Sequence, residues 1–207
     1  MPRVRIHFSK SGYACFISHL DLPMLFGRAA RRAGLRAEMT LGFSPHPKLA
    51  LCPPLPVGVI ALNEPADFWF VEWDGDSLAN WRESLPRGID ILDAREVDGS
   101  SLNKLCAAAS YSIEPLSGAE PSAIAEVLKI ALAQMGAFLR AEARGCDALI
   151  AANDLERCGP SFMVRRLCES NVVVGWGDLS IVRTAVGGWN EEEARVIPLT
   201  EDRDYGF

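Results

Sequence analysis

The segment Leu41-Gly42-Phe43-Ser44-Pro45-His46-Pro47-Lys48 divides the chain, and a second proline-rich run follows at residues 53–58. Each proline removes a backbone donor and pushes the preceding residue into extended geometry, which excludes a helix here. A central strand is excluded as well, because proline is confined to strand edges and ends. The sequence therefore predicts a stiff, extended loop. A plain surface connector with solvated side chains is the competing interpretation.

We expect this loop to contain both structural and functional residues. The structural ones fix the backbone or anchor the loop: Gly42, Phe43, Pro45, Pro47, Pro56 and Gly58. Phe43 is expected to anchor the loop in the core, and stacking on a nucleic acid base is the alternative. His46 is a candidate catalytic residue, because imidazole titrates near neutrality. Ser44 and Lys48 are candidate phosphate ligands.

A strand and a helix are predicted before the loop. Residues 3–9 alternate polar and apolar side chains, as a half-buried strand does. The helix begins at one of two positions. Ser18 and Asp21 have the spacing of a capping box, and alternatively Asp21 is the N-cap with Pro23 in the first turn. Gly34 ends the helix, in the position where glycine is favoured.

The start of this helix is a candidate anion-binding site, because free amides and the positive end of the dipole lie there. One flank of the helix carries Arg28, Arg31 and Arg32, and Ser18 lies at its start. His19 is a second candidate catalytic residue, with a structural role in the capping region as the alternative. If the proline loop folds back over the start of the helix, these cations and Lys48 converge on one phosphate-binding surface.

The charge distribution supports a local anion-binding face. The net charge of −6 argues against a general nucleic-acid-binding protein. However, residues 1–60 contain eight Lys or Arg and two Asp or Glu. Residues 61–207 contain thirteen Lys or Arg and twenty-five Asp or Glu. A basic N-terminal third on an acidic body is the asymmetry expected of such a face, although chance clustering would produce it too.

The order of the predicted elements indicates an α+β protein. After the first strand and helix come strands at 37–41, 58–62 and 66–73, a helix at 76–85 and a strand at 89–94. This β-α-β-β-α-β order is that of a ferredoxin-like unit. We therefore predict a first domain at residues 1–98, which carries the basic loop.

A second ferredoxin-like unit is predicted at residues 106–189. Its elements are a strand at 109–113, a helix that begins at Pro121 and is closed by Gly145, and strands at 147–151, 161–167 and 180–186. No helical period precedes the last strand, so the second unit is expected to be degraded, with its second helix lost. From Asn190 to the C-terminus we expect an acidic tail that frays.

The cysteines and the missing motifs limit the possible chemistry. Six cysteines are scattered without a CxxC pair, which predicts buried reduced thiols and no zinc site. There is no P-loop, GxGxxG, HExxH, GxSxG or CxxxCxxC motif, and we expect no metal and no cofactor. No segment is apolar enough to span a bilayer, and residues 1–5 lead directly into a strand pattern without a signal peptide. A cytoplasmic location is expected.

Four segments carry a family resemblance: FISHLDL at 16–22, RAARRAG at 28–34, GFSPHPK at 42–48 and LPVGV at 55–59, followed by Glu64. Together they resemble the radical-SAM-linked bacterial protein family. Its members occur as separate chains or fused behind a radical-SAM protein with a cobalamin-binding-type domain. The match is dense over residues 3–72, and beyond residue 110 it rests on element order. The resemblance implies a radical-SAM protein as partner.

These observations lead to one main functional hypothesis and two alternatives. The main hypothesis is an accessory protein that binds RNA, tRNA or rRNA, for modification by a radical-SAM enzyme. The first alternative is a metal-independent ribonuclease or small transferase, with His46 as acid or base and Lys48 stabilising charge. The second is an adaptor whose proline loop docks on the radical-SAM partner. The tandem order also resembles the RNA-processing endoribonucleases of CRISPR systems, at the level of the fold alone.

Overall fold

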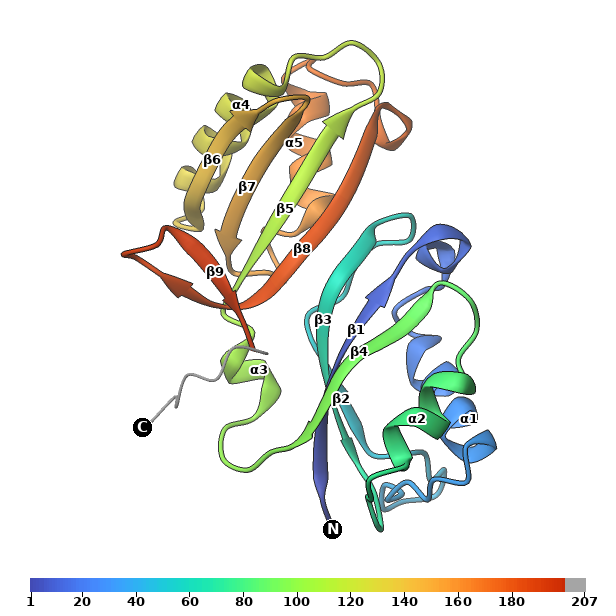
Figure 1. Cartoon of the computed structure of the whole chain (residues 1–207). Coiled ribbons are helices and arrows are strands. Elements are labelled where there is room, and N and C mark those ends of the chain that lie inside the picture. The colour runs from blue at the N-terminus through green and yellow to red at the C-terminus, as the bar shows by residue number, and fades with distance from the viewer. Residues whose placement is uncertain (200–207) are drawn as a thin grey trace.

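The computed structural model describes residues 1–199, and in this range nine strands form one mostly antiparallel sheet with five α-helices (Figure 1). The strands are β1 (Arg3–Lys10), β2 (Leu49–Leu51), β3 (Ile60–Trp69), β4 (Ile89–Glu96), β5 (Ala108–Pro115), β6 (Phe138–Arg144), β7 (Asp147–Asn153), β8 (Leu179–Asn190) and β9 (Arg195–Pro198). The helices are α1 (Leu22–Arg32), α2 (Ser77–Glu83), α3 (Leu102–Leu105), α4 (Pro121–Gln134) and α5 (Pro160–Glu169), with 3-10 turns η1 (Gly12–Phe16) and η2 (Trp176–Asp178). The predicted α+β class is confirmed.

The two halves of the chain have the same strand arrangement. In the N-terminal half the order is β4-β1-β3-β2, in the C-terminal half it is β8-β5-β7-β6, and all pairs within each half are antiparallel. Figure 1 shows α1 and α2 together on one side of the N-terminal strands. Because both sets of strands belong to one sheet, the division into two ferredoxin-like units and the domain limits stay predictions.

The halves are joined at β3 and β8. These strands pair in parallel over two residue pairs, Ile60 with Val182 and Ala61 with Arg183. A disulfide between Cys52, just after β2, and Cys106, just before β5, adds a covalent link. The expectation of reduced thiols is therefore wrong for this pair. Their separation of 54 residues in the sequence gave no indication that the fold brings them together.

An aromatic core explains the packing of the N-terminal half. Phe26 from α1 meets Phe8 and Phe68 edge to face, with ring centroids 5.0 and 5.4 Å apart. Trp81 from α2 closes the cluster and is fully buried. These rings bury large apolar areas and hold α1 in a fixed position against the sheet. Both the helix and the loop that follows it therefore rest on a rigid support.

Burial differs from expectation on the first strand. Strand β1 was predicted to be half-buried, but Arg5 and His7 on its polar face are buried as completely as its apolar face. Arg5 donates two hydrogen bonds to Asp67 on β3, at 2.7 and 2.9 Å, and His7 Nδ1 lies 2.8 Å from the Asn63 side-chain oxygen. The alternation of polar and apolar residues correctly predicted that β1 has a polar face. It did not predict that other parts of the chain bury this face.

Several predicted elements are corrected in the structure. The helix from residue 121 ends at Gln134 and does not continue to Gly145, because Gly136 has positive φ and residues 138–144 form β6. Residues 161–167, predicted as a strand, belong to α5, which begins with Pro160 in its first turn. The expected loss of the second helix is therefore wrong. Residues 49–51, assigned to the loop, form β2, whereas 37–41 make only isolated bridges.

The predicted tail is also corrected as far as the structure describes it. Instead of fraying from Asn190, the chain turns and returns along β8 as β9. Val196 and Ile197 are buried, and Val196 packs with Ala108, Ala151 and Ala185 of β5, β7 and β8. The remaining part of the predicted tail, residues 200–207, lies outside the described residues.

Candidate functional site

The proline loop is closed at its base by backbone hydrogen bonds. The Thr40 amide donates to the His46 carbonyl at 2.8 Å, and the His46 amide donates to the Thr40 hydroxyl at 3.2 Å. The Lys48 amide donates to the Glu38 carbonyl at 2.7 Å. Residues 41–45 between these bonds are exposed, and Gly42 has a φ of +136°, which only glycine adopts easily. The loop is therefore a short projection on a fixed base.

This projection lies against α1, although not against the start of the helix, where the sequence predicts it. A Cβ added to Gly27 would lie 3.0 Å from the Pro47 Cγ, so the missing side chain of Gly27 leaves the room that the proline ring occupies. Arg28 and Arg31 follow Gly27 on the same helix and are exposed. The contact is with the middle of the helix rather than with its start. The structure thus brings the loop beside the arginine flank.

Several predicted cations are already paired. Lys48 Nζ lies 3.0 Å from a Glu38 carboxylate oxygen and 4.9 Å from the centre of the Trp69 ring. Arg32 donates to the Ser84 carbonyl at 2.6 Å. In contrast, the side chains of Arg28 and Arg31 form no hydrogen bond or ion pair with residues 1–199. The predicted cationic surface is therefore reduced mainly to these two arginines.

His46 and Ser44 lie on the exposed part of the loop. The His46 Nδ1 approaches only the neighbouring Pro47 carbonyl, at 3.2 Å, and no carboxylate orients the ring among the described residues. Ser44 is exposed at the loop tip. Neither residue lines the small cavity or the open groove described below. The catalytic assignment of His46 stays a prediction.

The start of α1 follows the second of the two predicted alternatives, with Asp21 at the N-cap position and Pro23 in the first turn. Asp21 occupies the N-cap position, but its side chain makes no capping hydrogen bond and instead accepts one from the Ser18 hydroxyl at 2.7 Å. The Ser18 capping box is therefore absent. His19, next to Ser18, is half-buried and lines a small cavity rather than the arginine flank.

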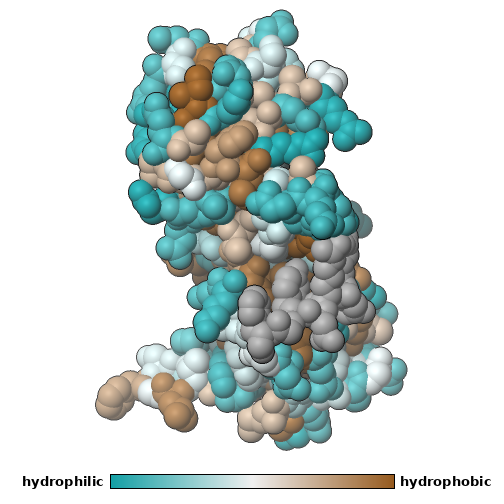
Figure 2. Space-filling view, turned by 90° about the vertical axis from the view of Figure 1, so that its left-hand side faces the viewer, coloured by the Kyte–Doolittle hydropathy of each residue, from teal (hydrophilic) through white to brown (hydrophobic). Residues whose placement is uncertain are grey.

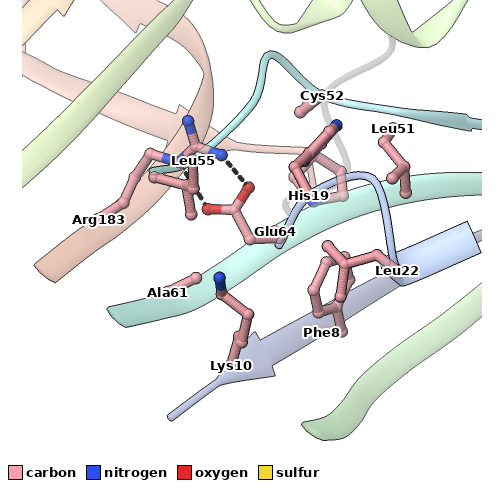
Figure 3. Close-up of a pocket in the computed structure, with 11 residues that line it drawn as sticks. Phe8, Lys10, His19, Leu22, Leu51, Cys52, Leu55, Ala61, Glu64 and Arg183 are labelled. Atoms are coloured by element: carbon pink, nitrogen blue, oxygen red, sulfur yellow. Dashed lines mark hydrogen bonds and ion pairs between the residues drawn. The ribbon is translucent and has the colours of Figure 1, made fainter. Parts of the chain in front are cut away.

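That cavity is lined by Glu64, which belongs to the family resemblance, and by Lys10 and Arg183, for which the sequence predicts no role. Arg183 on β8 donates to both carboxylate oxygens of Glu64 on β3, and also to the Pro53 carbonyl at 3.1 Å. Lys10 at the end of β1 is buried, and its amine donates to the Cys15 and Ile17 carbonyls at 3.3 and 3.2 Å. Figure 3 shows the Lys10 amine and the Arg183 guanidinium on different sides of Glu64, with His19 beside them.

Burial changes the titration of this group. Desolvation lowers the pKa of Lys10 and of His19, and the positive charge of Arg183 lowers both further. Tyr111 lies on the neighbouring strand β5, and its phenol is near Arg183. Burial raises the pKa of this phenol. The cavity itself measures about 10 Å³, which is room for roughly one water. It can hold a bridging water, but not an organic substrate, so we assign this group to joining the two halves.

The sequence contained only weak signals for the cavity residues. In the sequence, Lys10 and Arg183 contribute only to the charge count, and Glu64 is one of the residues that carry the family resemblance. A charged residue within an otherwise apolar strand, such as Arg183 among Val182, Ala185 and Val186, suggests a buried ion pair. The partner could not be identified, because Glu64 is 119 residues away in the chain.

Two further predicted residues have structural roles. Gly58 has a φ of +91°, and its amide donates to the Cys15 carbonyl at 3.0 Å. Pro56 lines an open groove of about 450 Å³ between the second proline run and the start of α5. Two arginines that line this groove already have partners within the chain. Arg157 forms an ion pair with Asp154, and Arg165 lies over the Phe162 ring.

Phe43 lies far from the core, so the expectation that it anchors the loop there is wrong. Phe43 and Leu41 are exposed over their whole side chains, with relative exposures of 110% and 102%. Further exposed apolar residues precede or begin α1: Tyr13, Phe16, Leu20 and Met24. On the face that Figure 2 shows, hydrophilic atoms predominate, and hydrophobic atoms project at the end formed by the N-terminal half. Exposed apolar groups of this kind often mark interaction sites.

Within residues 1–199, no three His, Cys, Asp or Glu side chains gather in a way that could hold a metal ion. None of the helices there has the length and apolar character that crossing a membrane requires.

Comparison with known proteins identified one family. A family model described as "Uncharacterized protein conserved in bacteria (DUF2344)" matches residues 3–145. This range includes the proline loop, α1 and the cavity residues Lys10 and Glu64. No curated protein matches the chain.

Proposed function

Since the chain belongs to the DUF2344 family of uncharacterized proteins conserved in bacteria, whose description assigns no activity, we propose a function from its exposed surface. In this proposal the chain binds RNA as an accessory protein of a radical-SAM enzyme. The RNA is a tRNA or rRNA that the enzyme modifies. The radical-SAM partner rests on the sequence resemblance, and RNA binding rests on the loop and the helix flank.

The observation that carries RNA binding is the position of two unpaired arginines beside a projecting loop. Arg28 and Arg31 are exposed on α1, and the loop packs on the same helix through Pro47 and Gly27. Guanidinium groups without an internal partner are free to bind phosphate oxygens. Because the helix is held by the aromatic core, the arginine backbones are fixed before binding, which reduces the entropy lost.

The adaptor alternative has support of its own from the exposed apolar residues. Tyr13, Phe16 and Leu20 lie on η1 and in the turn before α1, and a partner protein could cover them. The nuclease alternative is supported less, because within residues 1–199 the His46 imidazole is hydrogen-bonded only to the Pro47 carbonyl, and Lys48 is paired with Glu38. A general acid or base needs a group that sets its protonation and orientation.

The test is a salt titration of binding to total cellular RNA. We compare the wild-type chain with Arg28→Ala/Arg31→Ala and with a control, Arg87→Ala/Arg144→Ala, which removes the same charge from exposed positions elsewhere. Two lost phosphate contacts should lower the slope of log K against log salt by about 1.4 for single-stranded RNA. The control should keep the wild-type slope. Absence of RNA binding by the wild-type chain would refute the proposal.

If RNA binding is absent, the adaptor alternative is tested directly. The radical-SAM partner would be used to capture the purified chain in the absence of nucleic acid. Loss of capture in Phe16→Ser/Leu20→Ser, with retention in Arg28→Ala/Arg31→Ala, would assign the surface to protein docking.

A further inference from the structure

We infer that Phe43 is a stacking platform for an unpaired base, so that the RNA bound by this surface is single-stranded where it meets the loop. This inference deepens the proposed function and rests on it. The starting point is that Phe43 is a large aromatic residue with its whole side chain in water. An aromatic ring held this way buries no area in the folded chain, and therefore contributes nothing to the stability of the core.

The loop holds the Phe43 backbone in place although its side chain is free. Thr40 and His46 close the base with two hydrogen bonds, and Pro45 and Pro47 restrict the backbone between the tip and the base. Pro47 also fills the space above Gly27 on α1. The ring is thus presented on a short, braced projection, and little backbone entropy remains to be lost when a ligand stacks on it.

The charges near the loop identify the class of ligand. On the helix beneath, Arg28 and Arg31 have no partner among residues 1–199, while Lys48 at the base of the loop is paired with Glu38. A phosphate backbone lying along the arginines would leave its bases free to reach an aromatic ring. This combination of a cationic track and an aromatic ring is the one that binds single-stranded nucleic acid. A duplex keeps its bases stacked inside and offers the ring no face.

The neighbouring residue Leu41 provides a matched control within the loop. It is as exposed as Phe43 and lies on the same projection, but an aliphatic side chain cannot stack on a base. A merely hydrophobic contact with a protein partner would use both residues. Base stacking uses Phe43 alone, so the two side chains separate the two kinds of ligand.

The experiment measures dissociation constants for two probes, a 12-nucleotide oligouridylate and a 12-base-pair RNA duplex, at one salt concentration. Phe43→Ala should weaken binding of the single strand by about 5- to 150-fold, the range for loss of one base–aromatic stack. Binding of the duplex should not change. Phe43→Trp should retain single-strand binding, and its indole fluorescence should be quenched by the oligonucleotide beyond the wild-type change. Leu41→Ala should bind as the wild-type chain does.

The other outcomes distinguish the inference from the proposed function. If Phe43→Ala binds the single strand normally while Arg28→Ala/Arg31→Ala does not, stacking is refuted and RNA binding stands. If Phe43→Ala weakens both probes equally, or Leu41→Ala matches it, the loop acts through general contact and the inference fails. If the wild-type chain binds neither probe nor cellular RNA, both proposals fail together.

Discussion

Arg183 and Glu64 form a buried, doubly hydrogen-bonded ion pair across β8 and β3, where the two halves of the sheet meet. The exposed fractions of the two side chains are only 2% and 5%. Removing one partner leaves the other charge buried without compensation, so Glu64→Ala should lower the free energy of unfolding by about 3–5 kcal/mol. Urea unfolding of the purified variant measures this loss.

The double variant Glu64→Leu/Arg183→Met is the matched control for this prediction. It removes both charges and keeps the volume, so it should be more stable than Glu64→Ala. Lys10 stays buried nearby, and its amine keeps the Cys15 and Ile17 carbonyls as partners. A double variant as unstable as the single one would mean that the pair itself stabilises the junction, rather than merely avoiding an unpaired charge.

The Cys52–Cys106 disulfide should contribute to stability by restricting the unfolded chain. It closes a loop of 54 residues, for which the chain-entropy relation gives about 4 kcal/mol. Cys52→Ala/Cys106→Ala should therefore unfold at lower guanidinium concentration than the oxidised protein. Wild-type protein treated with dithiothreitol should behave like the variant, whereas Cys146→Ala, at an exposed free cysteine, should not. Equal midpoints in all four samples would contradict a stabilising disulfide.

His7 should make the stability of the protein depend on pH. Burial is the main cause that lowers its pKa from 6.5 to about 4, against the opposing hydrogen bond to Asn63. Between these two values the unfolded chain binds more protons than the folded chain, so stability falls as the pH falls from 6.5 to 4. The total loss is about 3 kcal/mol, and stability is fully present above pH 6.5.

The variant His7→Gln tests this dependence, because its amide can still donate to Asn63. It should flatten most of the slope between pH 6.5 and 4 in urea unfolding measurements. Some slope should remain from His19, whose pKa burial also lowers. A variant that keeps the full wild-type slope would show that other groups cause the acid sensitivity.

The charge count of the sequence predicted a basic face, but most of those bases are used inside the molecule. Of the eight in residues 1–60, Arg5 and Lys10 are buried, Arg3 and Arg32 donate to backbone carbonyls, and Arg36 and Lys48 pair with carboxylates. Which bases remain free depends on tertiary partners such as Asp67 and Glu72, which are more than 30 residues away. Composition can indicate an asymmetry, but not which charges reach the surface.

Secondary structure was predictable where periodicity was long and uninterrupted. The strands β1, β5 and β7 and the helix α1 lie where the pattern put them, because each buries a regular apolar series. Residues 160–169 were misassigned, since Phe162, Met163, Val164 and Leu167 form a short apolar run that fits a strand as well as a buried helix. Phe43 was predicted to be buried on the basis of its hydrophobicity alone. It is exposed instead, because the short loop that carries it does not reach the core.

Gly27 should control the position of the proline loop. A methyl group there would lie about 3.0 Å from the Pro47 Cγ, so the proline ring must shift by a few tenths of an ångström to make room. Gly27→Ala gains about 1 kcal/mol of helix propensity, which offsets part of the packing cost of about 1–3 kcal/mol. We therefore expect a small change in overall stability but faster amide exchange at Thr40, whose hydrogen bond closes the loop.

The matched control is Gly75→Ala, because an added Cβ at Gly75 has open space around it. It should leave exchange at Thr40 unchanged. The affinity for single-stranded RNA tests whether the proposed binding residues must also be correctly positioned. Gly27→Ala retains Arg28, Arg31 and Phe43. It should nevertheless weaken the proposed binding of single-stranded RNA, because the Phe43 ring and the arginines no longer keep their relative placement. Wild-type affinity together with accelerated exchange at Thr40 would mean that the loop need not be held against α1 for binding.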